Sequence, residues 1–229
     1  MDPRLVAAVE TSRRWYDDVC AVHEVPVWCD DRLWVALAAV PAYHSTVKTL
    51  TPDVGRDAVL AAMERHPVGG VADSFGTLDL SADGYTLLLD ATWLHHEGFD
   101  DAVWPEGWSV VREEALLAAW AEAHDYVDVL VPAVLAHGGF RVLARVADGV
   151  PVAGAVIHDA GPVAGLSNGW SSRGPVTALD HAELLACPAV LHPGRPVTAY
   201  AWGDELDAML DAGYQPLGAQ RVWVRNVIQ

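Results

Sequence analysis

The chain has 229 residues, of which 52% are hydrophobic and ten are tryptophan, and its formal net charge is −17 at pH 7. This composition is typical of a folded protein with one large or two small domains and excludes a disordered chain. Lys48 is the only lysine, and acidic residues are spread through both halves, so no basic face for nucleic acid is expected. No apolar run approaches the roughly 18 residues that a membrane span needs.

The first half predicts an alternation of helices and strands. In chain order we expect a helix over 4–23, an ambiguous apolar run at 33–40, a strand over 44–50, a helix over 53–66 and a strand over 85–94. The segment 97–107, which carries acidic residues, a proline and glycines, is the best linker. The cysteines Cys20, Cys29 and Cys187 are widely separated and are expected to be buried thiols in a reducing cytoplasm.

The second half predicts a longer series of elements. These are a strand over 108–111, helical pieces over 113–124 and 129–136, strands over 140–147, 152–157 and 163–170, a helix from 177 that ends at Pro188, a strand over 197–201, a helix over 204–211 and a strand over 214–224. Asp148-Gly149 is a strong hairpin signal between two of these strands. The order is neither a Rossmann alternation nor an all-β meander.

The two halves end in a similar way. In the stretch 66–93, Gly84-Tyr85 is followed by Trp93, and in the stretch 192–223, Gly213-Tyr214 is followed by Trp223. A repeat of this length is too long for a solenoid, whose units span roughly 20–50 residues. It predicts a duplicated domain or half-domain. A pseudo-twofold arrangement of the two copies would bring the ligand-binding gap of each copy onto one shared cleft.

The element order of the second half resembles that of the GNAT acyltransferase superfamily. The residues that carry the resemblance lie in three segments: 140–154, with its central hairpin, 165–168, and 212–218 with its Ala-Gly-Tyr close. The resemblance implies an α+β fold of GNAT-like mixed sheets with flanking helices, built as two tandem related halves. The halves would be a truncated GNAT-like half at 1–100, which lacks the central hairpin, and a GNAT-like domain at 104–229.

The resemblance also implies acetyl coenzyme A as a cosubstrate, and one loop argues against it. GNAT proteins hold the coenzyme A pyrophosphate on backbone N–H groups of a glycine-rich loop at a helix N-terminus. The equivalent loop here, 171–180, has Gly174 alone, followed by Pro175, which has no backbone N–H. The corresponding stretch of the first half, 51–57, carries two carboxylates. Neither loop is a convincing phosphate site.

Acid–base candidates are expected where strands begin or end. His44 begins a predicted strand and Asp73 ends one, and both are candidate catalytic residues, with His158 as a further acid–base candidate. The resemblance implies a general-acid role for Tyr214. No metal site is expected, because the adjacent His95 and His96 on one strand point to opposite faces.

The substrate is expected at the gap between the strands 163–170 and 197–201. The predicted substrate-binding residues there are Ser167, Asn168, Trp170, Tyr200 and Trp202. The corresponding gap of the first half would be lined by His44, Lys48 and Asp73. Three functions remain open: transfer of an acetyl group from coenzyme A to a small amine, chemistry on an amine without coenzyme A in specialised metabolism, and a non-catalytic binding subunit. We expect a cytoplasmic protein that binds a small-molecule amine and neither nucleic acid nor membrane, as a monomer or as a homo- or hetero-oligomer.

Overall fold

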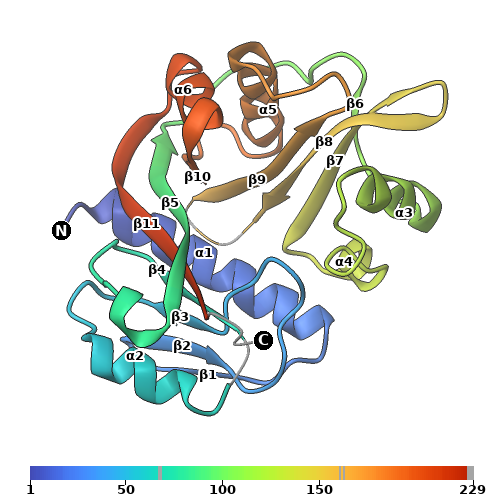
Figure 1. The fold of residues 1–229 in the computed structure, drawn as a ribbon. Helices are drawn as coiled ribbons and strands as arrows, with labels where there is room; N and C mark the ends of the chain where they lie inside the picture. The colour runs from blue at the N-terminus through green and yellow to red at the C-terminus, as the bar shows by residue number, and fades with distance from the viewer. Residues whose placement is uncertain (67–68, 160, 162, 226–229) are drawn as a thin grey trace.

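The computed structural model describes residues 1–66, 69–159, 161 and 163–225 (Figure 1). The helices are α1 (Pro3–Val22), α2 (Arg56–Met63), α3 (Glu114–Ala123), α4 (Ala133–Ala136), α5 (Ala178–Leu191) and α6 (Gly203–Asp211), with a 3₁₀ turn η1 at Ser81–Asp83. The strands are β1 (Val27–Cys29), β2 (Leu33–Ala36), β3 (Val47–Thr49), β4 (Gly70–Asp73), β5 (Tyr85–His96), β6 (Trp108–Val110), β7 (Phe140–Ala147), β8 (Val150–His158), β9 (Ala164–Ser171), β10 (Val197–Ala201) and β11 (Gln215–Arg225).

The described strands form one mixed sheet in the order β1-β2-β3-β4-β11-β5-β10-β9-β8-β7-β6. Two pairs are parallel, β3 with β4 and β9 with β10, and the other neighbours are antiparallel. The α+β class and the element order predicted for the second half are confirmed. The separation of the chain into two halves of common origin stays a prediction.

The last strand of the chain lies between two strands of the first half. β11 pairs with β4 on one side and with β5 on the other, and β5 in turn pairs with β10 of the second half. Figure 1 shows the red β11 beside the green β5 over most of its length. The two predicted halves therefore share one continuous sheet.

The tryptophans of the repeated pattern lie on opposite faces of this sheet. Trp93 packs against Ala8 and Val9 of α1, whereas Trp223 packs with Met63 of α2. The spacing from the shared glycine to the tryptophan differs by one residue between the two stretches. Because side chains alternate along a strand, a shift of one residue turns a side chain to the other face. A register shift between Val222 and Trp223 accompanies this difference.

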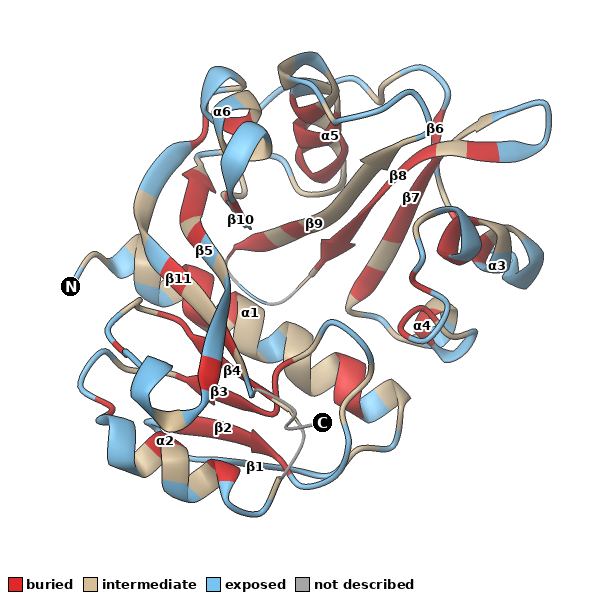
Figure 2. Ribbon diagram, viewed as in Figure 1, coloured by how far each residue is buried: buried red, intermediate tan, exposed pale blue. Residues whose placement is uncertain are grey.

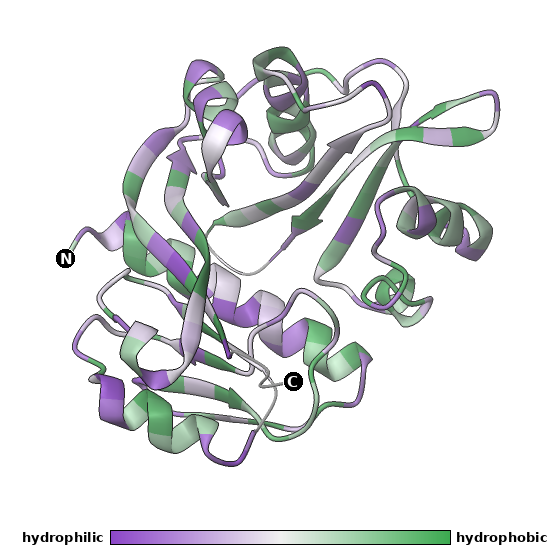
Figure 3. Cartoon of the chain, viewed as in Figure 1, coloured by the Kyte–Doolittle hydropathy of each residue, from purple (hydrophilic) through white to green (hydrophobic). Residues whose placement is uncertain are grey.

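Helices cover both faces of the sheet. Along β7, Leu143 joins the core beneath α5 and α6, whereas Val142 and Ala144 join the core beneath α3 and α4. Because both faces are covered, buried residues follow one another along much of β7 and β8, as Figure 2 shows, and β7 is largely hydrophobic in Figure 3. The long helix α1 contacts β5, β9, β10 and β11, so it crosses the junction of the two predicted halves.

Several sequence expectations need correction. The first half does contain a short antiparallel hairpin, β1 with β2, although none was expected. Helix α5 continues through Pro188 to Leu191, and the helical piece expected at 129–136 is helical only from Ala133. Cys20 and Cys187 are buried as expected, but Cys29 is exposed, as are all three residues of the edge strand β1.

Candidate active site

The parallel strands β9 and β10 separate soon after they meet. They are paired at Ala164 with Val197 and at Gly165 with Thr198, and the ladder ends there although β9 continues to Ser171. The hydrogen-bonded pairs that would close a regular sheet are therefore missing beyond Gly165. The two strands therefore diverge beyond this point.

A β-bulge shapes the β9 side of this opening. Ser167 is paired with Val156 of β8, and the next paired residue of β9 is Trp170, so Asn168 and Gly169 together lie opposite one residue of β8. Asn168 has a φ of 55°, in the left-handed region, as bulged residues often do. Its Nδ2 donates a hydrogen bond of 3.0 Å to Ser167 Oγ. The bulge turns these polar groups out of the regular ladder.

A cavity of about 270 Å³ lies at the divergence. Residues of α1, β5, β8, β9, β10, α5 and α6 line it, together with residues of the segments before β3 and after α3. Its walls are rich in aromatic rings, which come from Trp15, Tyr16, Tyr43, Trp93, Tyr126, Tyr200 and Trp202. Such a cavity, apolar with a few convergent polar groups, is typical of a small-molecule site.

The structure brings most of the predicted substrate-binding residues to this cavity. Ser167, Asn168, Tyr200 and Trp202 line it, whereas Trp170 does not. The Trp170 ring is instead stacked on His124, at 6.1 Å between ring centroids, and contacts Trp120 edge to face. Trp170 therefore forms part of the core behind the cavity wall.

His44, one of the two predicted catalytic residues of the first half, lines the same cavity. Trp15 Nε1 donates a hydrogen bond of 2.9 Å to His44 Nε2, and His44 Nδ1 lies 2.8 Å from the carbonyl oxygen of Ala42. Both ring nitrogens of the neutral imidazole are thus hydrogen-bonded. Burial lowers the pKa of His44 to about 4. This geometry leaves His44 no free lone pair with which to accept a proton.

Asp73 and Tyr214 lie away from the cavity lining. The Asp73 carboxylate accepts the backbone N–H groups of Leu78, at 2.8 Å, and Phe75, at 3.3 Å, and so holds the turn after β4. Burial raises the pKa of Asp73. Tyr214 is buried in the core beneath α5 and α6, and burial raises its pKa as well. The structure does not bring these two residues together with His44.

Two cavity residues carry chemistry that the sequence analysis did not single out. Glu205 of α6 is the one lining residue with a formal negative charge among the residues described, and burial raises its pKa with no ion pair or hydrogen bond contributing. His181 of α5 is buried, and neither of its ring nitrogens has a partner in the described part of the chain. Glu205 lies in an acidic first turn of α6, where a carboxylate is ordinary, so the sequence offered no signal.

The N-terminus of α5 does not fit a coenzyme A pyrophosphate. Thr177 caps the helix, and the Asp180 carboxylate accepts hydrogen bonds from Thr177 N, at 3.0 Å, and from Thr177 Oγ1, at 2.6 Å. Pro175 offers no N–H in the preceding loop. An anion at this helix end would meet a carboxylate in the place where free N–H groups are needed.

Among the described residues, no group of three or more histidine, cysteine, aspartate or glutamate side chains is placed to hold a metal ion. None of the helices formed by residues 1–66, 69–159 and 163–225 is long and apolar enough to cross a membrane.

Solved structures share this fold over nearly their whole length. A GCN5-related N-acetyltransferase from Kribbella flavida matches with a TM-score of 0.59 at 18% identity, covering 94% of this chain and 95% of that one. A functionally unknown conserved protein from Staphylococcus epidermidis matches with a TM-score of 0.64 at 11% identity, over 90% and 95%. A GCN5-related N-acetyltransferase from Sphaerobacter thermophilus matches with a TM-score of 0.53 at 11% identity, over 97% and 90%. No protein-family model and no curated protein matches the sequence.

Proposed function

We propose that this chain, which has the GNAT fold, transfers an acyl group to the nitrogen of a small amine bound between β9 and β10. The observation that carries the proposal is the cavity at the divergence of these two parallel strands. In an open α/β sheet, ligands bind where neighbouring strands part. The volume of about 270 Å³ suits a small molecule.

The lining of the cavity favours a cationic ligand. Glu205 supplies a negative charge, and burial keeps it from being fully satisfied by water. Burial lowers the pKa of His44, His124 and His181, so these lining residues are neutral near pH 7 and do not repel a cation. The faces of aromatic rings such as Trp202 add cation–π attraction. An ammonium group is the ligand chemistry that all of these features attract.

A second candidate function is chemistry on the bound amine without coenzyme A, such as a condensation or a ring closure. The observation that favours it is the occupied N-terminus of α5, where Asp180 takes the place of a phosphate. A non-catalytic binding role is the third outcome. It would apply if the amine binds and no acyl transfer or other turnover follows.

Calorimetric titration with acetyl coenzyme A separates these functions. Binding in the micromolar range, together with mass-spectrometric detection of an N-acetylated amine, supports the acyltransferase. Absence of binding at millimolar concentration removes acetyl coenzyme A as the donor. The same titration is repeated with the Asp180→Ala variant. This substitution removes the carboxylate from the helix end, while Arg173, 3.5 Å from Asp180, remains to contact a phosphate.

The amine site is tested separately by the fluorescence of the cavity tryptophans. We expect n-butylammonium to bind and n-butanol to bind more weakly. Glu205→Gln should weaken the binding of n-butylammonium by about tenfold, which corresponds to roughly 1.4 kcal/mol of binding free energy. Asp204→Asn is the matched control, because Asp204 is exposed in the same turn of α6 and does not line the cavity. Equal affinities for the ammonium and the alcohol would contradict a cationic substrate.

A further inference from the structure

His158 lines the cavity and is almost completely buried, with 1% of its surface exposed. It is the last residue of β8 and is paired with Phe140 of β7 and with Gly165 of β9. Gly165 is the residue after which β9 and β10 diverge. His158 is therefore fixed by the sheet beside the point where the cavity opens.

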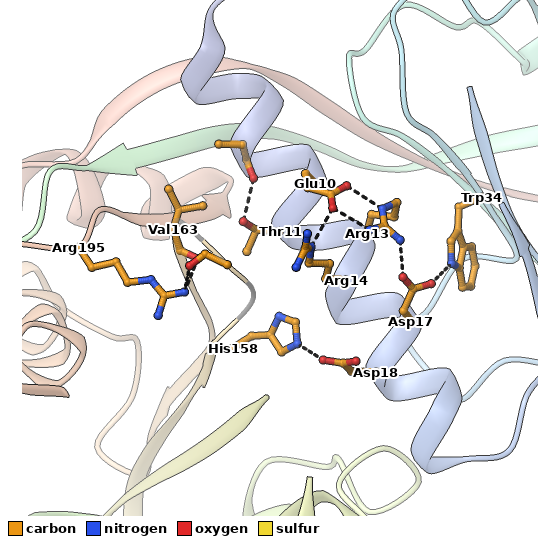
Figure 4. Close-up of polar contacts among 12 residues, drawn as sticks. Glu10, Thr11, Arg13, Arg14, Asp17, Asp18, Trp34, His158, Val163 and Arg195 are labelled. Carbon is orange, nitrogen blue, oxygen red and sulfur yellow. Dashed lines mark hydrogen bonds and ion pairs between the residues drawn. The ribbon is translucent and has the colours of Figure 1, made fainter. Parts of the chain in front are cut away.

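Asp18 of α1 fixes the orientation of the His158 ring. His158 Nε2 lies 2.7 Å from Asp18 Oδ2, as Figure 4 shows. A carboxylate can only accept a hydrogen bond, so Nε2 carries the proton and donates it. In the neutral ring, Nδ1 then keeps a free lone pair. This nitrogen is shielded from solvent and has no hydrogen-bond partner among the residues described.

The Asp18 carboxylate lies close to Gly139. A Cβ atom at Gly139 would lie 2.7 Å from Asp18 Oδ2, closer than such atoms approach. The other oxygen of Asp18 is 3.6 Å from His137 Nε2. Asp18 thus lies between two histidines and close to Gly139, where a larger residue would require the carboxylate to shift. The unpartnered Nδ1 of His158 costs the folded state about 1–3 kcal/mol, so we expect this nitrogen to have a functional role.

We propose that His158 is the catalytic base of this site and that Asp18 is its positioning residue. The inference rests on the proposed function for the identity of the proton donor. His158 Nδ1 first takes one proton from the bound ammonium, which frees the lone pair of its nitrogen. That nitrogen then forms its bond to the acyl carbon of an activated acyl donor such as a thioester, while that carbon loses its bond to the leaving group. The leaving group takes the bonding electron pair and the second proton of the nitrogen. Asp18 stabilises the resulting imidazolium, as the carboxylate of a serine-protease triad does.

His44 and His181 show why His158, and not either of them, is assigned this role. Both nitrogens of His44 are bonded, to Trp15 and to Ala42, whereas His158 has one nitrogen oriented by a carboxylate and one nitrogen free. His181 has two free nitrogens and no carboxylate to select its tautomer. The combination of an oriented and a free nitrogen occurs at His158.

The test is long-range ¹H–¹⁵N NMR of the full chain with ¹⁵N-labelled histidine. The His158 signals are assigned by their loss in His158→Gln. We expect the neutral ring to carry its proton on Nε2 and not on Nδ1, and the Nδ1 resonance to move when n-butylammonium binds. A neutral ring that carries its proton on Nδ1 in the wild-type protein overturns the proposal. A bound amine that leaves the Nδ1 resonance unmoved also overturns it, whereas absence of any bound amine contradicts the proposed function and this inference with it.

Asp18→Asn tests the positioning residue and does not depend on whether His158→Gln folds. The amide can donate to His158 Nε2, so we expect the Nδ1–H tautomer to appear and kcat for acyl transfer to fall by about 10²-fold or more, with KM for the amine little changed. Asp17→Asn is the matched control on the same helix, because Asp17 is bonded to Arg13 and Trp34 and not to a histidine. An unchanged tautomer and kcat in Asp18→Asn would show that Asp18 does not position the base.

Discussion

Lys48 carries an amine that is buried in the core. The residue is fully buried, and its Nζ has no hydrogen-bond acceptor in the described part of the chain. Nζ lies 5.2 Å from the centre of the Tyr16 ring and 5.4 Å from that of Trp93. Burial lowers the pKa of Lys48 to about 7, and Asp73 opposes this only in part. Replacement of Lys48 by methionine should therefore stabilise the protein.

The magnitude follows from the pKa shift. The ordinary lysine pKa is 10.5 and the folded value is about 7, and each unit corresponds to about 1.4 kcal/mol, so protonated Lys48 costs the folded state about 5 kcal/mol below pH 7. Above pH 7 the folded state loses this proton while the unfolded chain keeps it up to about pH 10.5. Wild-type stability should therefore rise with pH across this window, by about 1.4 kcal/mol per unit from this group.

Urea denaturation of the wild type and of Lys48→Met at several pH values between 6 and 10 measures the effect. We expect Lys48→Met to be the more stable protein by several kcal/mol at about pH 6 and the difference to shrink steadily above about pH 7. Lys48→Arg is the control, because a guanidinium keeps its proton over this range and should be destabilising throughout. Parallel stability curves for the wild type and Lys48→Met would refute the reasoning.

Three further changes test the packing, a helix cap and the cavity charge. Gly154→Ala would place a Cβ atom 2.0 Å from Trp120 Nε1 and 2.4 Å from Trp170 Nε1, so it should lower the unfolding free energy by about 3 kcal/mol or more, and an unchanged melting temperature would contradict the close packing. Thr177→Ala removes the N-cap of α5 and should cost about 1 kcal/mol in urea denaturation; a neutral change would mean that the cap is not needed. Burial raises the pKa of Glu205, so folding favours its protonated form and its ionisation destabilises the fold as pH rises. Glu205→Gln should therefore melt higher than the wild type at neutral pH, with the gap closing below the ordinary glutamate range, and a constant gap would argue against this origin.

Local patterns predicted the elements of the second half well. The strands β7 and β8 are joined at Asp148-Gly149, and Asp148 and Gly149 both adopt positive φ, as the turn signal implies. The order of elements from β6 to β11 also follows the sequence prediction, and with it the resemblance to the GNAT fold. Pattern and turn chemistry are local, so a single sequence contains them.

Local sequence patterns did not predict which distant strands pair or which distant residues share the cavity. Nothing local indicates that β11 pairs with β4 and β5, nor that His44 lies in one cavity with Ser167. The partnership of Asp18 with His158 also depends on where α1 crosses the sheet, since the two residues are 140 positions apart. Candidate residues could be selected by type, but the sheet decides which of them meet.

The position of β11 constrains how the protein reaches its native state. Arg221 of β11 forms an ion pair with Asp90 of β5, 131 positions earlier in the chain. Until β11 arrives, β4 and β5 each present an unpaired edge, and such edges favour association with other chains. Closing so long a loop is also slow compared with local folding. We therefore expect the refolding rate of this chain to be limited by the docking of β11. A synthetic peptide of residues 214–225, which contains β11, should suppress the aggregation of a variant truncated before residue 214.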